Sequence, residues 1–173
     1  MNLRILTQLL VKRQMKQATI NLFKKIFATL KPPPNISLSE WADKYRYLSA
    51  KSSAEPGKWS TDRTPYLREV MNAITDLQTE KVVFMSCAQV GKTDGLILNT
   101  IGYFIHYDPA AIIAMQPTVK LAESFSKDRL SMMLEDTPVL RGKVNDKGRN
   151  SGNTILQKNY PGGHVTMIGA NSA

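Results

Sequence analysis

The sequence contains few of the residues that staple small domains or bind metal ions. Its 173 residues include one cysteine, Cys87, and two histidines, His106 and His164. A single cysteine excludes an internal disulfide framework and a cysteine-based metal site. The histidines lie far apart in the chain and show no spacing typical of metal ligands. The sequence therefore does not indicate a disulfide-rich scaffold or a histidine metal centre.

Long hydrophobic runs are missing too. No apolar run approaches the roughly 18 residues that a membrane-spanning helix requires, and no signal-peptide pattern with a cleavage site is present. With 42% hydrophobic and 21% charged residues, the composition is that of a globular protein, and the length suffices for one domain with a core. We expect a folded domain without a membrane partner.

Acidic residues are absent from the first 31 positions, although the whole chain contains 14. The same segment carries seven cations, so most of the net charge of +9 is concentrated there. Its apolar residues recur at near-helical spacing, at Leu3, Leu6, Leu10, Leu22, Ile26 and Leu30. Residues 1–31 are therefore predicted to form a basic amphipathic helical arm, which the proline-rich linker 32–36 ends. Such an arm is compatible with binding to nucleic acid or to a protein partner. It also resembles an acid-poor transit peptide, and the remaining alternative is a solvated helix without a partner.

One motif stands out against these absences. An apolar run from residue 82 leads into Ser86-Cys87-Ala88-Gln89-Val90-Gly91-Lys92-Thr93, and a helical pattern follows to Phe104. Strand, loop and helix in this order form a phosphate-binding loop, where backbone N–H groups and the helix dipole bind a triphosphate. Lys92 is predicted to contact the β- and γ-phosphates, and the Thr93 hydroxyl to bind Mg²⁺. The motif has Ser86 where glycine is usual, and the alternative is a tight strand-to-helix turn with a solvated Lys92.

Helical and strand patterns alternate over residues 37–173. We expect helices from Ser37, over 65–77, from the loop to His106 and over 119–134, the last with Leu121, Phe125, Leu130 and Met133 facing the core. Strands are expected at 82–86, 111–115, 154–157 and 164–168. This order predicts an α/β domain of the P-loop NTPase type, with a mostly parallel sheet flanked by helices.

An acidic residue at the end of a hydrophobic strand is missing as well. Phosphate-loop ATPases hold Mg²⁺ with an aspartate there and activate water with an adjacent glutamate. Asp94, Asp108 and Glu123 fall on predicted helices or turns instead. We therefore expect the chain to bind nucleotide, to hydrolyse it poorly alone, and to represent the front part of a longer ATPase domain.

Eight short motifs resemble, in order, the large terminase subunit of tailed bacteriophages, of the lambda-like GpA type. They occupy residues 39–43, 53–57, 65–69, 89–93, 116–118, 125–130, 161–163 and 169–172. The resemblance implies an ATP-driven motor that threads viral DNA into a procapsid, a helicase-like parallel α/β core, and a separate nuclease domain. It implies ATP and Mg²⁺ as cofactors.

The resemblance also assigns roles to single residues. Ser86 to Thr93 corresponds to the phosphate loop of the family. The stretch from Trp59 to Arg68 corresponds to its adenine-side segment, in which Tyr66 stacks on the base and Leu67 stands where the family often has glutamine. Residues 116–118 correspond to a segment that lies near DNA. The acidic metal-binding strand, the coupling motif and the nuclease of the family are not found in this sequence.

The resemblance implies three partners in the host bacterial cytoplasm: double-stranded viral DNA, the small terminase subunit and the portal of the procapsid. In the family the arm attaches to the small subunit, whereas its cations alone equally suit salt-sensitive DNA binding. A basic loop over 141–152 is a second candidate for DNA contact or a solvated loop; its cations are Arg141, Lys143, Lys147 and Arg149. The alternatives are a non-enzymatic prophage remnant that binds DNA or protein, and a different helicase-like nucleotide-binding enzyme.

Overall fold

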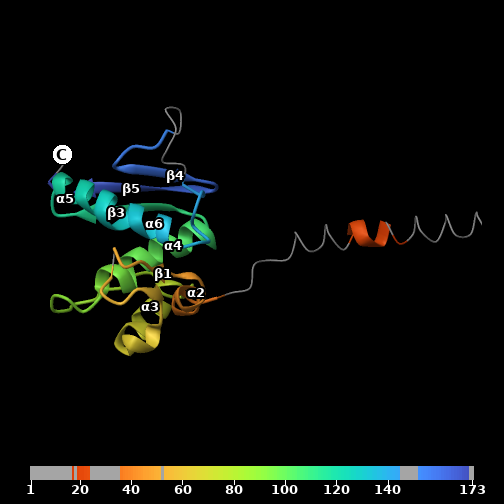
Figure 1. The fold of residues 1–173 in the computed structure, drawn as a ribbon, viewed down its shortest axis with the longest axis horizontal. Helices are drawn as coiled ribbons and strands as arrows, with labels where there is room; N and C mark the ends of the chain where they lie inside the picture. The colour runs from red at the N-terminus through yellow and green to blue at the C-terminus, as the bar shows by residue number, and fades with distance from the viewer. Residues whose placement is uncertain (1–16, 18, 24–35, 52, 145–151, 172–173) are drawn as a thin grey trace, which may run out of the picture. The chain divides into compact units, whose positions relative to one another are not determined.

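The computed structural model describes residues 17, 19–23, 36–51, 53–144 and 152–171. The chain divides into two units, residues 1–35 and 36–173 (Figure 1). In the first unit residues 17 and 19–23 are helical, and the rest of the expected arm lies outside the described residues, as do positions 32–35 of the linker. Within the described ranges, no helix is both long enough and apolar enough to cross a membrane.

A three-stranded sheet organises the second unit, with β3 (Ala111–Gln116) and β4 (Gln157–Tyr160) on either side of β5 (Gly163–Gly169). β3 runs parallel to β5, and β4 runs antiparallel to it. The prediction of a mostly parallel sheet is wrong for the described strands, because β4 and β5 are joined by a two-residue turn. A parallel pair requires a long crossover, and Gly162 (φ +88°) supplies the left-handed backbone that the tight turn needs. A separate ribbon pairs β1 (Tyr47–Leu48) with β2 (Gly57–Lys58).

The predicted helices form, with local 3₁₀ and π turns. Before the loop they are α2 (Leu38–Tyr45), the 3₁₀ turns η1 (Thr61–Arg63) and η2 (Pro65–Leu67), and α3 (Arg68–Ile74). After it come the π-helix η3 (Thr93–Leu98), α4 (Asn99–His106), α5 (Val119–Ser124), the π-helix η4 (Phe125–Leu130) and α6 (Ser131–Asp136). Helix α2 starts with a capping box, in which the Ser37 hydroxyl accepts from the Glu40 N–H and the Glu40 carboxylate accepts from the Ser37 N–H.

The helices pack against one face of the sheet. α4, α5 and α6 lie under the strands, and α2 and α3 lie beyond them (Figure 1). On the covered face Val165 is fully buried, whereas Ile113 on the opposite face is 69% exposed. Leu121 is half exposed and Ala122 is buried in its place, so the predicted core face of residues 119–134 is partly wrong. The buried positions Ala122, Ser126, Leu130 and Met133 recur at helical spacing, and Leu121 lies at the edge of the face that they define.

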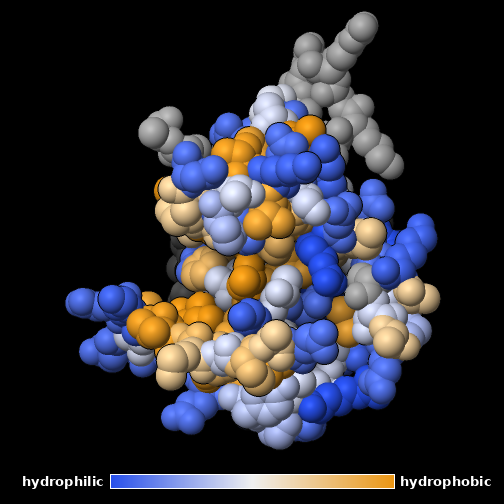
Figure 2. Space-filling view, turned by 90° about the vertical axis from the view of Figure 1, so that its left-hand side faces the viewer, coloured by the Kyte–Doolittle hydropathy of each residue, from blue (hydrophilic) through white to orange (hydrophobic). Residues whose placement is uncertain are grey.

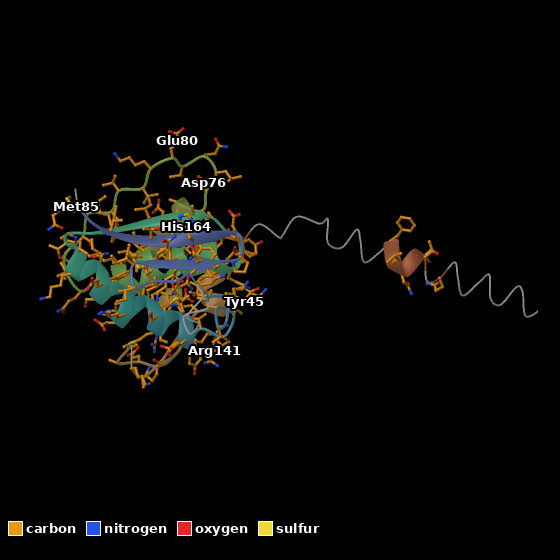
Figure 3. The ribbon with its side chains drawn as sticks, turned by 90° about the horizontal axis from the view of Figure 1, so that it is seen from above. Tyr45, Asp76, Glu80, Met85, Arg141 and His164 are labelled. Carbon is orange, nitrogen blue, oxygen red and sulfur yellow. The ribbon has the colours of Figure 1, made fainter. Side chains whose placement is uncertain are left out.

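The strand predicted at 82–86 is absent, and residues 81–87 have no regular secondary structure. Val83 and Met85 are 77% and 96% exposed. In Figure 3 the segment from Asp76 past Glu80 to Met85 runs around the outside of the sheet, and Figure 2 shows hydrophobic residues at the surface on this side. A strand forms when a neighbour pairs with its N–H and C=O groups. None of the described strands pairs with residues 81–87.

Candidate functional site

The backbone of the predicted loop has the form of an anion-binding turn. Gln89 and Gly91 have φ angles of +61° and +74°, and Lys92 returns to a helical φ of −57°. Alternation between left- and right-handed backbone directs successive N–H groups into one concave site, the geometry called a nest. The Gly91 carbonyl accepts the Gly95 N–H over 2.8 Å, so the helix begins within the motif. The loop therefore combines the alternating φ signs typical of a nest with a helix start, and both features favour an anion.

The side chains of the loop are accessible. Lys92 is exposed, Thr93 is half-buried, and Cys87 is an exposed free thiol. The Ser86 hydroxyl is buried and has no hydrogen-bond partner in the described part of the chain. Buried hydroxyl groups are normally satisfied, so the loop fits a ligand that would supply the missing partner.

A metal ion at this loop would depend on Thr93 and on the ligand. Across the described ranges, no group of three or more His, Cys, Asp or Glu side chains is arranged to hold a metal. Mg²⁺ commonly takes one or two protein oxygens, with phosphate and water as its other ligands. The donor set at Thr93 therefore fits a nucleotide-bound Mg²⁺ better than a metal held by protein alone.

The predicted adenine-side segment packs directly on the helix that follows the loop. A Cβ atom added to Gly95 would lie 2.5 Å from Cδ1 of Leu67 and 3.4 Å from the Trp59 indole. Glycine at position 95 therefore permits this close approach. The Tyr66 hydroxyl donates a hydrogen bond to the Val90 carbonyl, and the residue remains 54% exposed. The structure thus brings Tyr66 to the loop that the sequence places 20 residues later.

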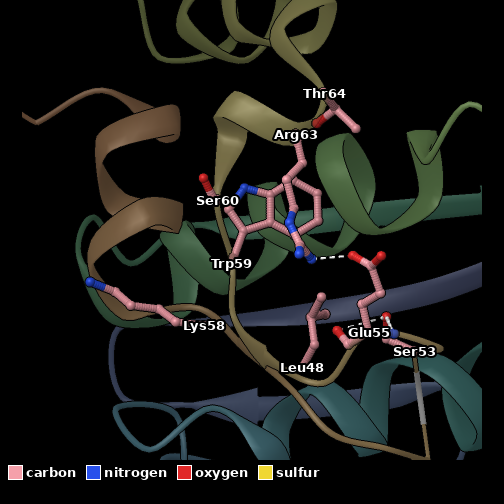
Figure 4. A pocket seen from close by; sticks show the side chains of 8 residues that line it. All are labelled: Leu48, Ser53, Glu55, Lys58, Trp59, Ser60, Arg63 and Thr64. Atoms are coloured by element: carbon pink, nitrogen blue, oxygen red, sulfur yellow. Dashed lines mark hydrogen bonds and ion pairs between the residues drawn. The ribbon is translucent and has the colours of Figure 1, made fainter.

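On its other side the same segment lines a pocket of about 290 Å³ (Figure 4). The indole of Trp59 is largely buried, and its N–H donates to the Thr61 hydroxyl over 3.1 Å. Arg63 and Glu55 form an exposed ion pair beside the pocket. Tyr66 and the loop do not line this pocket, which is therefore a feature separate from the loop.

The candidate DNA-contact residues lie elsewhere. Gln116 ends β3, and the Thr118 hydroxyl caps α5 by accepting the Leu121 N–H over 3.2 Å. Arg141 donates from Nε to the Glu135 carbonyl, whereas Lys147 and Arg149 lie outside the described residues.

Sequence reasoning missed the partners of one residue beside the loop. The sequence predicts a helical position for Asp94 and no partner. In the structure its carboxylate forms ion pairs with the guanidinium groups of Arg46 and Arg129. These arginines are 48 and 35 positions away, and no spacing in the sequence signals such a contact.

Comparison with known proteins identifies relatives of the chain. The family model described as "Phage terminase large subunit gpA, ATPase domain" matches residues 53–173. The chain is 30% identical over 132 residues to "Terminase, large subunit" of Enterobacteria phage P21, and 29% identical over 134 residues to "Terminase, large subunit" of Escherichia phage lambda. These matches cover 76% and 77% of this chain but 20% of each relative, so the chain spans about a fifth of their length. No solved structure matches the chain.

Proposed function

Because the chain belongs to the family of the gpA ATPase domain of phage terminase large subunits, we propose that it binds Mg-ATP at Ser86–Thr93 as part of a DNA-packaging motor. The observation that carries the proposal is the nest at Gln89 and Gly91 directly before the helix start at Lys92. A solvated strand-to-helix turn needs neither two left-handed residues in close succession nor an unpaired buried hydroxyl at Ser86.

Each residue of the site has a proposed task. The N–H groups of Ala88 to Gly91 and the side chain of Lys92 bind the phosphates, and the Thr93 hydroxyl holds Mg²⁺. Tyr66 stacks on the adenine, since its ring is exposed while its hydroxyl is fixed to the loop. ATP supplies the free energy that the packaging motor of the family uses to move DNA.

We propose that hydrolysis by this chain alone is slow. The strands β3 and β5 end at Gln116 and Gly169, so neither presents a carboxylate at its carboxyl end. Phosphoryl transfer to water depends on metal placement and on a group that orients the water. This chain therefore has the means to bind the triphosphate and lacks, in the described strands, the acidic group that activates the nucleophile.

The partners proposed for the motor are double-stranded DNA, the small terminase subunit and the portal, in the cytoplasm of the host bacterium. Arg141, the first cation of the basic loop, is exposed, and Lys143 is half-buried. DNA binding through such cations, or through the arm 1–31, should weaken steeply as salt rises. A flat salt response would favour attachment of the arm to a protein.

Calorimetric titration with Mg-ATP tests the nucleotide site. Lys92→Ala should weaken binding by roughly tenfold or more, because it removes a charged donor to the phosphates. Lys81→Ala removes an equal charge from an exposed position before the loop and serves as the control. Equal effects of the two substitutions, or no binding by a folded wild-type chain, would overturn the proposal and favour the DNA- or protein-binding module.

A further inference from the structure

A buried arginine connects the end of α2 to the helix after the loop. The Arg46 side chain is 1% exposed, and its guanidinium donates to Asp94 Oδ1 over 3.4 Å and to the Thr137 hydroxyl over 3.1 Å. It also donates to the Tyr47 carbonyl, while its Nε has no partner in the described ranges. Arg46 therefore joins three segments that are far apart in the sequence.

Keeping an arginine so far from water is energetically unfavourable. Burial lowers the pKa of Arg46 to about 10, although the carboxylates of Asp94 and Asp136 act to raise it. Apolar side chains of similar volume often replace buried ion pairs without loss of stability, because they avoid the desolvation cost. A buried ion pair is therefore weak evidence that this arginine is there for stability alone.

The position of Asp94 suggests what the arginine does. Asp94 directly follows Thr93, and its second oxygen lies 3.9 Å from Nη1 of Arg129 on η4. A carboxylate without these partners, next to the phosphate loop, would repel a triphosphate and compete for its metal. Each arginine engages one oxygen of Asp94. Arg129 is 49% exposed, so the buried Arg46 provides the better-shielded contact.

We propose that Arg46 is a positioning residue for the phosphate loop, which through Asp94 fixes the first turn of η3 and with it Lys92 and Thr93. This inference rests on the proposed nucleotide binding and deepens it. The contact connects the loop to α2 and, through Thr137, to the end of α6. Two helices outside the loop then determine how the loop presents its cation and its hydroxyl.

Substitution of Arg46 separates this role from a structural one. Arg46→Met leaves Asp94 with the partly exposed Arg129 as its remaining arginine partner, so the variant should melt below the wild-type temperature. The folded variant should bind Mg-ATP about tenfold more weakly, the usual scale for the loss of such support. Lys44→Met removes the same charge from an exposed position of α2, where the ammonium lies over the Tyr45 ring, and should leave ATP binding unchanged. A folded Arg46→Met chain with wild-type ATP affinity would overturn the proposal.

Asp94→Asn tests the same link from the other side. If Asp94 acted through its negative field alone, its neutralisation would tighten ATP binding, whereas loss of positioning weakens it. The Arg46→Met/Asp94→Asn double variant should bind ATP no more weakly than whichever single variant binds it more weakly, because both changes break the same contact. If Arg46→Met does not fold, unchanged or tighter ATP binding by a folded Asp94→Asn chain overturns the proposal.

Amide hydrogen exchange without nucleotide keeps this test independent of ATP binding. Exchange across Gly95 to Leu98 should be faster in Arg46→Met than in Lys44→Met. If the wild-type chain binds no ATP and this difference is still seen, the proposed nucleotide function has failed and the link to η3 stands. Equal exchange in the two variants contradicts the link whatever the chain binds.

Discussion

The hydroxyl of Tyr66 donates a hydrogen bond of 3.0 Å to the carbonyl oxygen of Val90. This contact ties the 3₁₀ turn η2 to the residue between the two left-handed positions of the loop. It fixes the phenol end of Tyr66 and leaves much of the ring accessible. One residue thus both supports the loop and offers a surface for a base.

Removal of that hydroxyl should weaken nucleotide binding modestly. Tyr66→Phe keeps the ring and loses a hydrogen bond worth about 1 kcal/mol. Because this bond is already made without ATP, only the loss of loop ordering affects binding, and ATP affinity should fall by at most roughly fivefold. Tyr66→Ala also loses base stacking, worth about 1–3 kcal/mol, and should bind more weakly still. Calorimetry with Mg-ATP measures both. Tyr66→Ala with wild-type affinity would remove Tyr66 from the site.

Gly95→Ala should destabilise the domain. The new methyl group would lie 2.5 Å from Leu67 Cδ1, and overpacking of this kind costs about 1–3 kcal/mol. The free energy of unfolding in urea reports the loss. Combining Gly95→Ala with Leu67→Ala removes the clashing atom, so the double variant should be more stable than the sum of the single effects predicts. Strict additivity would show that the two residues are not in contact.

The stability of the domain should fall as the pH drops below about 6.5. The Trp41 indole N–H donates to His106 Nδ1 over 3.0 Å, an arrangement that requires the nitrogen to be unprotonated. Burial, and secondarily the charge of Lys143, lowers the pKa of His106 in the folded chain. The unfolded chain, with a histidine pKa of about 6.5, therefore takes up the proton first as the pH falls. The stabilisation that neutral His106 provides is complete above the unfolded-state pKa of about 6.5. It declines as the pH falls toward the lower pKa of His106 in the folded chain.

His106→Gln provides the comparison for this effect, because a glutamine amide does not titrate and its oxygen can still accept a hydrogen bond. Urea unfolding of both chains between pH 7.5 and 5.5 measures the slope of the free energy of unfolding against pH. The wild-type chain should show the steeper decline. Equal slopes would mean that His106 does not contribute to the pH dependence.

The sequence predicts those features that depend on neighbouring residues. Ser37 and Glu40 mark the start of α2. The strand expected at 154–157 forms at Gln157–Tyr160 instead, directly before the turn to β5. Contacts between distant residues decide the rest. A strand at 82–86 requires a neighbouring strand, and an apolar run alone does not provide one. The links from Arg46 to Asp94 and from Tyr66 to Val90 arise from packing of segments that no local pattern connects.

Hydrogen exchange at the loop amides, with and without Mg-ATP, tests the central claim most directly. Nucleotide held by the nest should slow exchange at Ala88 to Thr93 and leave the β4–β5 hairpin unchanged. The Lys92→Ala chain at the same ATP concentration should show no slowing. Protection confined to another region, such as the pocket around Trp59, or absent everywhere in a folded chain, would contradict nucleotide binding at this loop.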